Sequence, residues 1–212
     1  TTVHGAYSFA NPLKRRYNAI MTTGDRVIAN SKFIAEHLLQ HYAMDSARVR
    51  VVPRGIDLTR YDATKVSAER VIRLSRAWRL PDGSPVVMLP ARLTRLKGHA
   101  VLIEAVARLN RPDVVCLLVG AVGDRTRYRD QLLALAAKRG LGARLLLVDH
   151  CDDMPAAYML ADVVVSASTQ PESFGRIVTE AQAMGRPVVV SNHGGAPEQI
   201  RIGVTGWVST PG

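Results

Sequence analysis

Short apolar runs alternate with longer amphipathic segments through the last two thirds of the chain. The runs lie at Val86–Leu89, Val114–Val119, Leu145–Val148, Val163–Val165 and Pro187–Val190. Apolar spacing typical of helices falls at Ala100–Leu109, Tyr128–Arg139 and Met154–Leu160, and again after residue 172. Strand followed by helix, repeated along the chain, predicts an α/β fold with a doubly wound parallel sheet. Ligands of such sheets bind at the carboxyl ends of the strands, so the loops at those ends are the place to look for chemistry.

The first part of the chain predicts the end of a second α/β unit. Thr1 begins what reads as the last part of a strand, and the expected elements after it are a helix at Tyr17–Met21, a strand at Arg26–Ala29 and a helix at Ser31–Tyr42 capped by Ser31. A polar stretch at Leu58–Ser67 then leads to a helix-like segment at Glu69–Arg79. We therefore predict two parts, residues 1–62 and residues 63–212.

Residues 163–198 have the order strand, loop, helix, strand, loop, with two carboxylates in the middle. Glu172 is expected just before the helix, Ser173–Gly175 to open it, and Glu180 to follow eight residues later. Eight residues of helix rise about 12 Å, so the pair could hold two ends of one elongated ligand. Free N–H groups at the helix start would favour an anion. The alternative is that Glu172 only complements the helix dipole and Glu180 is solvated.

The loop at residues 90–99 follows the first strand of the larger part and carries two cations, Arg92 and Lys97. Arginine can bind two phosphate oxygens at once and lysine supplies a compact point charge, a combination suited to a diphosphate leaving group. The alternative is that both are solvated, as most loop cations are.

The composition is that of a soluble globular protein, with 47% hydrophobic and 22% charged residues. No apolar run approaches the ~20 residues that a membrane helix needs. The two cysteines, Cys116 and Cys151, have no spacing typical of a metal site or disulfide framework, which fits a reducing cytoplasm. The chain begins at Thr1 rather than methionine, so we expect that its true beginning could be missing.

The formal net charge of +10 puts a positive field on some face of the protein, which suits an anionic partner or surface. Nucleotide phosphates, an anionic membrane and nucleic acid would each satisfy it. Nucleic acid is the poorest match, because the arginines are dispersed, aromatic residues are only 5% and no nucleic-acid-binding motif is present.

Two further motifs are considered and set aside. His150, Cys151, Asp152 and Asp153 are consecutive and lack the spacing of metal ligands, so no metal is expected there. Gly120 and Gly123 follow a strand but lack the G-x-G-x-x-G spacing of a dinucleotide fingerprint.

The stretch E-S-F-G-x4-E from Glu172 to Glu180, the A-Q-A-M-G-R-P-V-V-V after it and the turn Gly194-Gly195-x-Pro197-Glu198 resemble the retaining, nucleotide-sugar-dependent glycosyltransferases of family four. That resemblance covers nearly all of the chain. It implies a GT-B-like fold in which residues 63–212 form the nucleotide-sugar-binding Rossmann-like domain and residues 1–62 the last part of the acceptor-side domain. The early half of that acceptor-side domain and the final helices of the family are absent, so the resemblance implies a partial chain.

The resemblance also implies roles for individual residues. Arg92 and Lys97 would bind the donor diphosphate, Glu172 the sugar hydroxyls and His4 the region beside the transferred sugar. Residues implied to bind the rest of the donor are Glu180, at the ribose, Ser173, Phe174 and Gly175, at the phosphate and sugar, and His150, near the nucleobase. Arg176 and Ile177 are also implied to bind the donor, with no part of it assigned to them. Two residues depart from the family pattern, Arg54 in place of a common asparagine and Asp149 in place of a common glycine. No chemistry is assigned to Arg54.

The expected activity is sugar transfer with retention to an acceptor hydroxyl of a glycan or lipid-linked molecule, in cell-envelope or exopolysaccharide synthesis. No metal or other cofactor is expected, because the basic pair would take the place of the metal. The charge suggests a cytoplasmic enzyme with possible peripheral contact to anionic membrane. Two alternatives stay open, a sugar-nucleotide epimerase of the GT-B fold and a non-catalytic nucleotide-binding fragment, because fold alone does not decide function.

Overall fold

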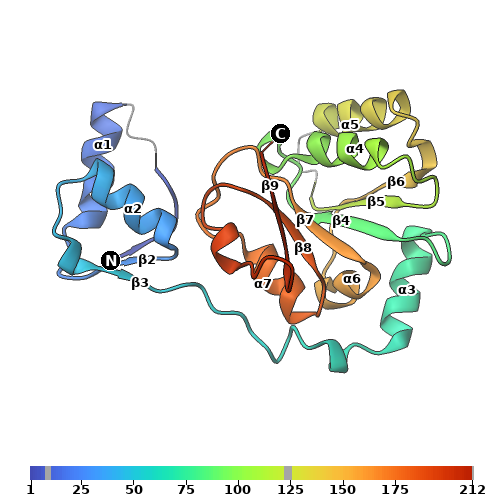
Figure 1. Ribbon diagram of the computed structural model, residues 1–212, viewed down its shortest axis with the longest axis horizontal. Coiled ribbons are helices and arrows are strands. Elements are labelled where there is room, and N and C mark those ends of the chain that lie inside the picture. The colour runs from blue at the N-terminus through green and yellow to red at the C-terminus, as the bar shows by residue number, and fades with distance from the viewer. Residues whose placement is uncertain (8–10, 122–125, 212) are drawn as a thin grey trace.

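The computed structural model describes residues 1–7, 11–121 and 126–211, which contain two parallel sheets (Figure 1). The smaller sheet has the order β1-β2-β3 and the larger β6-β5-β4-β7-β8-β9. The strands are β1 (Thr2–Val3), β2 (Val27–Ala29), β3 (Val49–Val51), β4 (Val86–Pro90), β5 (Val115–Val119), β6 (Leu145–Val148), β7 (Val163–Ser166), β8 (Val188–Ser191) and β9 (Gly206–Ser209). The helices are α1 (Pro12–Ala19), α2 (Lys32–His41), α3 (Ala68–Trp78), α4 (His99–Arg108), α5 (Thr126–Lys138), α6 (Met154–Leu160) and α7 (Arg176–Ala183).

The predicted doubly wound parallel sheet is confirmed, with three corrections to its surroundings. The first helix is Pro12–Ala19 rather than Tyr17–Met21, because the side chain of Asn11 caps its start by accepting a hydrogen bond from the Leu13 N–H at 2.9 Å. The strand β9 (Gly206–Ser209) was not predicted. Helix α7 begins at Arg176, after the Ser173–Gly175 segment that was expected to open it.

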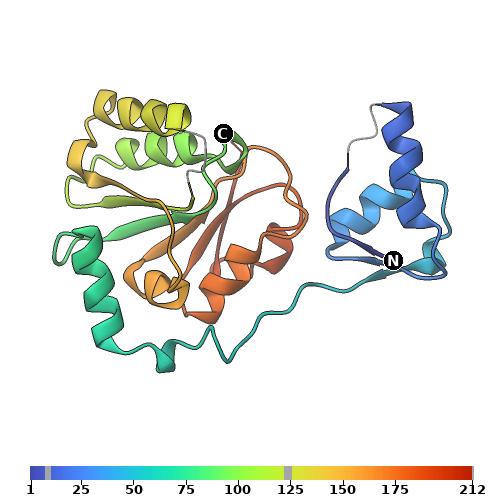
Figure 2. The same ribbon diagram turned by 180° about the vertical axis from the view of Figure 1, so that it is seen from behind.

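The larger sheet is buried on both faces, as a parallel sheet must be. Along β5, Cys116 and Leu118 belong to the core under α4 and α5, while Leu117 and the two terminal valines belong to the core under α6 and α7. This alternation follows from the period of two in a strand. Figures 1 and 2 show α4 and α5 on one side of the sheet and α6 and α7 on the other.

The order of the larger sheet reverses direction between β4 and β7. From β4 the chain adds β5 and β6 on one side, then returns to β7 and adds β8 and β9 on the other. The loops after β4 and β7 therefore leave the same edge of the sheet as neighbours. Such a reversal point is where open α/β sheets form their binding crevice.

The smaller sheet has its own core, in which Val3, Ala29 and Ile34 are completely buried. The predicted cap of α2 is confirmed, since the Ser31 hydroxyl oxygen accepts a hydrogen bond from the Ile34 N–H at 3.1 Å. Within the described residues, no helix of the chain is long and apolar enough to cross a membrane.

An extended segment connects the two sheets and leads into α3 (Figure 2). Helix α3 is held against the larger sheet by Arg70, whose Nε and Nη2 donate to the two Asp153 carboxylate oxygens at 2.9 and 2.6 Å. That ion pair holds the pKa of Asp153 below its usual range. The predicted division at residues 62 and 63 falls in this connection and stays a prediction.

Candidate functional site

A cleft of about 340 Å³ lies where the carboxyl edges of the two sheets face each other. This volume is within the usual range for a small-molecule site. The smaller sheet contributes three lining residues and the loops of the larger sheet contribute the others. The lining residues are His4, Asn30, Arg54, Pro90, Ala91, Arg92, Lys97, Glu172, Ser173, Phe174, Gly175, Arg176 and Ile177.

The loop after β4 brings both predicted cations, Arg92 and Lys97, to this cleft. Gly98 ends the loop in the left-handed region, with φ of 71°. A Cβ atom at Gly98 would collide with the carbonyl of Ala167 after β7. The close approach that glycine permits therefore fixes Lys97 beside the β7 loop.

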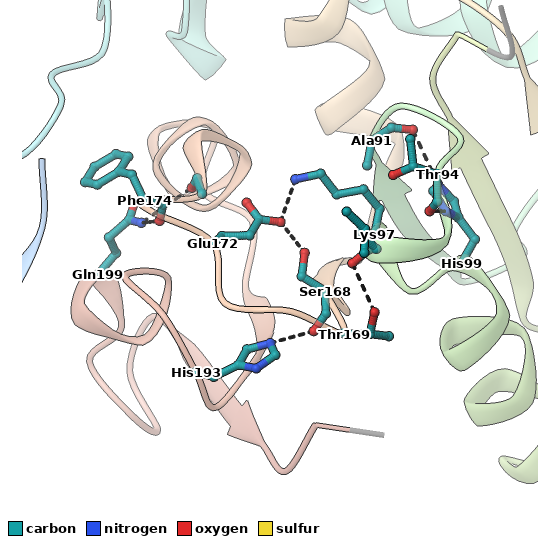
Figure 3. A network of polar contacts seen from close by, with 12 residues as sticks. Ala91, Thr94, Lys97, His99, Ser168, Thr169, Glu172, Phe174, His193 and Gln199 are labelled. Atoms are coloured by element: carbon teal, nitrogen blue, oxygen red, sulfur yellow. Dashed lines mark hydrogen bonds and ion pairs between the residues drawn. The ribbon is translucent and has the colours of Figure 1, made fainter. Parts of the chain in front are cut away.

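His99 supports the same loop from inside the protein. The ring is completely buried, with Nδ1 3.3 Å from the Thr94 carbonyl oxygen and Nε2 3.4 Å from the Ala91 carbonyl oxygen (Figure 3). Burial lowers the pKa of His99. A neutral ring has one N–H and can donate to only one of these two carbonyl oxygens, while the ring as a whole fills the space inside the loop that carries Arg92.

Lys97 and Glu172 form an ion pair at the floor of the cleft. The Lys97 Nζ lies 2.6 Å from the Glu172 Oε1, and the Ser168 hydroxyl donates to the same oxygen (Figure 3). His193 in turn contacts the Ser168 carbonyl oxygen through Nε2 at 2.7 Å. Both charged side chains are partly buried, with 29% and 17% of their surface exposed. One Glu172 oxygen is thus held on two sides, which fixes the direction of the carboxylate.

The Glu172 backbone is held by the glycine turn that the sequence singled out. The Gly195 N–H donates to the Glu172 carbonyl oxygen at 2.8 Å, and Gly194, with φ of 70°, has no space for a Cβ beside the same backbone. Ser173–Gly175 lie between Glu172 and the start of α7, in non-helical conformation. The helical rise expected between Glu172 and Glu180 is therefore wrong for the first part of the interval.

Glu180 lies on α7, outside the lining of the cleft. Its Oε2 accepts a hydrogen bond from the Tyr158 hydroxyl at 2.8 Å. Tyr158 is completely buried, and burial, followed by the Glu180 charge, raises its pKa well above the usual value. Tyr61, from the connecting segment, packs near Tyr158 with ring centroids 6.2 Å apart. Glu180 is thus oriented by a protonated tyrosine rather than left as a free surface charge.

His4 lies across the cleft from the Arg92 loop, on the smaller sheet. Its Nδ1 is 2.9 Å from the Arg54 Nη2. Because arginine only donates, Nδ1 is the acceptor and the ring proton is on Nε2. The sequence assigned no chemistry to Arg54, yet this residue sets the tautomer of a predicted site residue.

His150 is exposed and lies outside the lining of the cleft, where its Nε2 is 2.8 Å from the Asp152 Oδ1. Among the described residues there is no group of three or more histidine, cysteine or acidic side chains that could hold a metal ion. Gly123, part of the glycine pair that was set aside, lies outside the described residues.

Sequence reasoning missed residues that act across long separations. Glu198 accepts hydrogen bonds from the Lys32 N–H at 2.8 Å and the Phe33 N–H at 2.7 Å, and so caps α2 of the smaller sheet from the larger one. Only the pattern Gly194-Gly195-x-Pro197-Glu198 hinted at it. Asn30 and Ser168 carry no sequence signal of their own.

Two protein-family models match the chain. Residues 72–212 match the family described as Glycosyl transferases group 1. Residues 1–60 match Glycosyltransferase Family 4.

Similar proteins agree with these matches. The D-inositol 3-phosphate glycosyltransferase of Nocardia farcinica is 34% identical over 194 residues, a match covering 88% of this chain and 42% of the relative, so the chain spans less than half the length of that protein. A glycosyltransferase from Rickettsia africae superposes with a TM-score of 0.91 at 34% identity, covering all of this chain and 56% of that one. HepE of Anabaena, solved with UDP-glucose, superposes with a TM-score of 0.85 at 29% identity, covering all of this chain and 58% of that one. The chain therefore belongs to the group 1 glycosyltransferases and has the C-terminal part of their GT-B fold.

Proposed function

We propose that the protein to which this chain belongs transfers a sugar from a nucleotide diphosphate sugar to an acceptor hydroxyl, with retention of configuration. The observation that carries the proposal is the meeting of Arg92, Lys97 and Glu172 in one cleft at the reversal point of the larger sheet. Cations placed where a leaving diphosphate gains charge stabilise the transition state directly.

The proposed donor binding follows the same geometry. Arg92 and Lys97 bind the diphosphate, Glu172 binds hydroxyls of the sugar, and the N–H groups after Glu172 bind phosphate or sugar oxygens. Glu180, oriented by Tyr158, binds the ribose hydroxyls. The likeness to an Anabaena protein solved with UDP-glucose favours uridine as the base. His150 keeps its proposed place near the base, although it does not line the cleft.

No metal is needed in this proposal, because Arg92 and Lys97 supply the positive charge. In this proposal, Glu172 and Glu180 do not form the acid–base pair of a hydrolytic site. Glu172 is held by Lys97 and Ser168, and Glu180 is held by Tyr158 outside the cleft, an arrangement that supports binding roles.

We propose a peripheral site of action at anionic membrane on the cytoplasmic side, with a glycan or lipid-linked acceptor of the cell envelope. Helix α1 and the residue after it support this proposal, since Leu13, Tyr17 and Ile20 are 79%, 75% and 62% exposed, next to the basic run at 14–16. Exposed apolar and basic residues together favour anionic bilayer surfaces. Cosedimentation with phosphatidylglycerol vesicles at low salt tests this. Binding that is unchanged in Leu13→Ser/Tyr17→Ser would contradict the role of α1.

The activity is tested by incubating the full-length protein with UDP-, GDP- and ADP-linked sugars, with and without candidate acceptors. Nucleotide release that depends on an acceptor, with an unchanged anomeric configuration by NMR, supports a retaining transferase. Conversion of the donor sugar into its epimer without any acceptor would support the epimerase instead. Binding without turnover would support a nucleotide-binding role.

A further inference from the structure

Asn30 is the least explained polar residue of the cleft. Its side chain is 2% exposed, and neither Oδ1 nor Nδ2 has a hydrogen-bond partner within the described part of the chain. Burying an amide without partners costs folding free energy, so buried amides are almost always satisfied. Departures from this rule in native proteins are expected mainly at functional sites.

The position of Asn30 follows from the register of the smaller sheet. Val3 pairs with Ala29, and Ala29 pairs with Val51. His4 and Asn30 are therefore the next residues after the paired ends of adjacent strands, and Arg54 lies three residues beyond β3. All three leave the carboxyl edge of a parallel sheet and line the cleft. This edge repeats, on a smaller scale, the rule that places ligands at the carboxyl ends of strands.

The two walls of the cleft differ in chemistry. The wall from the larger sheet carries Arg92, Lys97 and Glu172, the charged groups to which the proposed function assigns the diphosphate and a sugar hydroxyl. The wall from the smaller sheet contains Asn30, whose buried amide is unpaired, the Arg54 guanidinium, and a His4 ring that Arg54 holds as an Nε2–H donor. The amide and the His4 Nε2–H together provide donors and an acceptor, which matches hydroxyl groups.

We propose that Asn30 is a substrate-binding residue whose amide hydrogen-bonds hydroxyl groups of a sugar held between the two walls. Arg54 is a positioning residue that keeps His4 in the donor tautomer beside it. This inference rests on the proposed function and extends it to a residue with no part in the motifs of the sequence. The hydroxyls could belong to the transferred sugar or to the acceptor, and the experiment below separates these sources.

The test uses the full-length protein with Asn30→Leu, which keeps the branched shape of the side chain, and Asn30→Ala as a second variant. Affinity for UDP and for UDP-glucose is measured by calorimetry, and KM for the donor and for an accepted acceptor by steady-state kinetics. Loss of one neutral hydrogen bond is expected to change the affected affinity or KM by about threefold to tenfold. If the transferred sugar is the partner, the affinity for UDP-glucose falls while the affinity for UDP does not change. If the acceptor is the partner, acceptor KM rises while both nucleotide affinities stay equal to wild type.

Thermal unfolding without ligand separates binding from structure. Because Asn30 has no partner in the described protein, Asn30→Leu should leave the melting temperature unchanged or raise it. A fall of several degrees in both variants would show that the amide is needed for the fold, and would overturn the proposal. So would variants that match the wild type in donor affinity and in both KM values. Arg54→Met removes the donor to the His4 Nδ1 and, if Arg54 only positions His4, should reduce kcat more than it changes UDP affinity.

The two proposals fail in different ways. If the wild-type protein neither binds nor turns over any nucleotide sugar, the proposed function fails whatever the variants do. If the wild type is active and Asn30→Leu is equally active and equally tight for every substrate, the transferase function stands and the role of Asn30 is wrong.

Discussion

The Lys97 Nζ and the Glu172 Oε1 form an ion pair across 2.6 Å in the cleft. The proposed function assigns each of them a different part of the donor, so the donor must compete with this ion pair. Glu172→Gln removes the competitor for Lys97 and should leave UDP affinity unchanged or higher, while lowering kcat/KM for UDP-glucose. Lys97→Met should lower both the UDP affinity and kcat/KM for UDP-glucose. Calorimetry with UDP, next to donor kinetics, checks this prediction.

The double variant Lys97→Met/Glu172→Gln completes the comparison. Residues in direct contact usually show coupling of about 0.5–3 kcal/mol. Strict additivity in UDP affinity would contradict the idea that the two groups act on one ligand.

Tyr158 orients the proposed ribose-binding carboxylate of Glu180. Tyr158→Phe removes only the hydroxyl, so we expect UDP affinity to fall about tenfold to a hundredfold, as for the loss of one hydrogen bond to a charged group. Tyr128→Phe is the matched control, because Tyr128 is also a buried tyrosine but lies on α5, in the core on the other face of the sheet. Equal affinity in the two variants would remove the case for Tyr158 as a positioning residue.

Glu198 joins the two sheets by capping α2. Glu198→Ala should loosen the smaller sheet from the larger, because two backbone N–H groups lose their acceptor. The expected results are a larger radius of gyration by small-angle X-ray scattering and a higher KM for the acceptor. Glu36→Ala, which removes an exposed carboxylate from the same helix, should show neither change. The prediction is wrong if both variants scatter like the wild type.

His99 predicts a pH dependence of stability. Burial lowers its pKa in the folded state, so the unfolded chain binds the proton more readily. Stability from the neutral ring is fully present above the unfolded pKa of about 6.5 and declines as the pH falls below it. Denaturant unfolding from pH 8 to 5 should show the free-energy gap between wild type and His99→Gln shrinking as the pH falls. A gap that stays constant contradicts this assignment.

The sequence predicted the larger sheet well because its strands are buried on both faces. Runs such as Leu145–Val148 are apolar at every position and bounded by polar turns, so their position and type follow from local pattern. The strand β9 was not predicted from the sequence, because Trp207 is exposed and the segment has no continuous apolar run. The start of α7 was misplaced because Gly175 takes a left-handed conformation, with φ of 87°, that only tertiary contacts specify.

The residues of the candidate site that stand in a sequence motif were predicted to lie there. The residues that only the folded geometry brings to the site were missed. Arg92, Lys97 and Glu172 stand in phrases typical of a family, and the structure brings them together. Asn30 and Ser168 are ordinary polar residues in the sequence. Their places depend on strand register in one case and on the meeting of two loops in the other, and neither is encoded locally.

The central claim is that the Arg92 loop stabilises a departing nucleoside diphosphate. The most direct measurement is kcat of the full-length protein with its nucleotide sugar for Arg92→Ala, beside Arg95→Ala in the same loop. Arg95 donates to the Gln131 side chain at 2.6 Å and lies over the Tyr128 ring, so it serves as the matched control. We predict a fall of about 10²–10³ in kcat for Arg92→Ala and little change for Arg95→Ala. Equal turnover in the two variants would contradict the account.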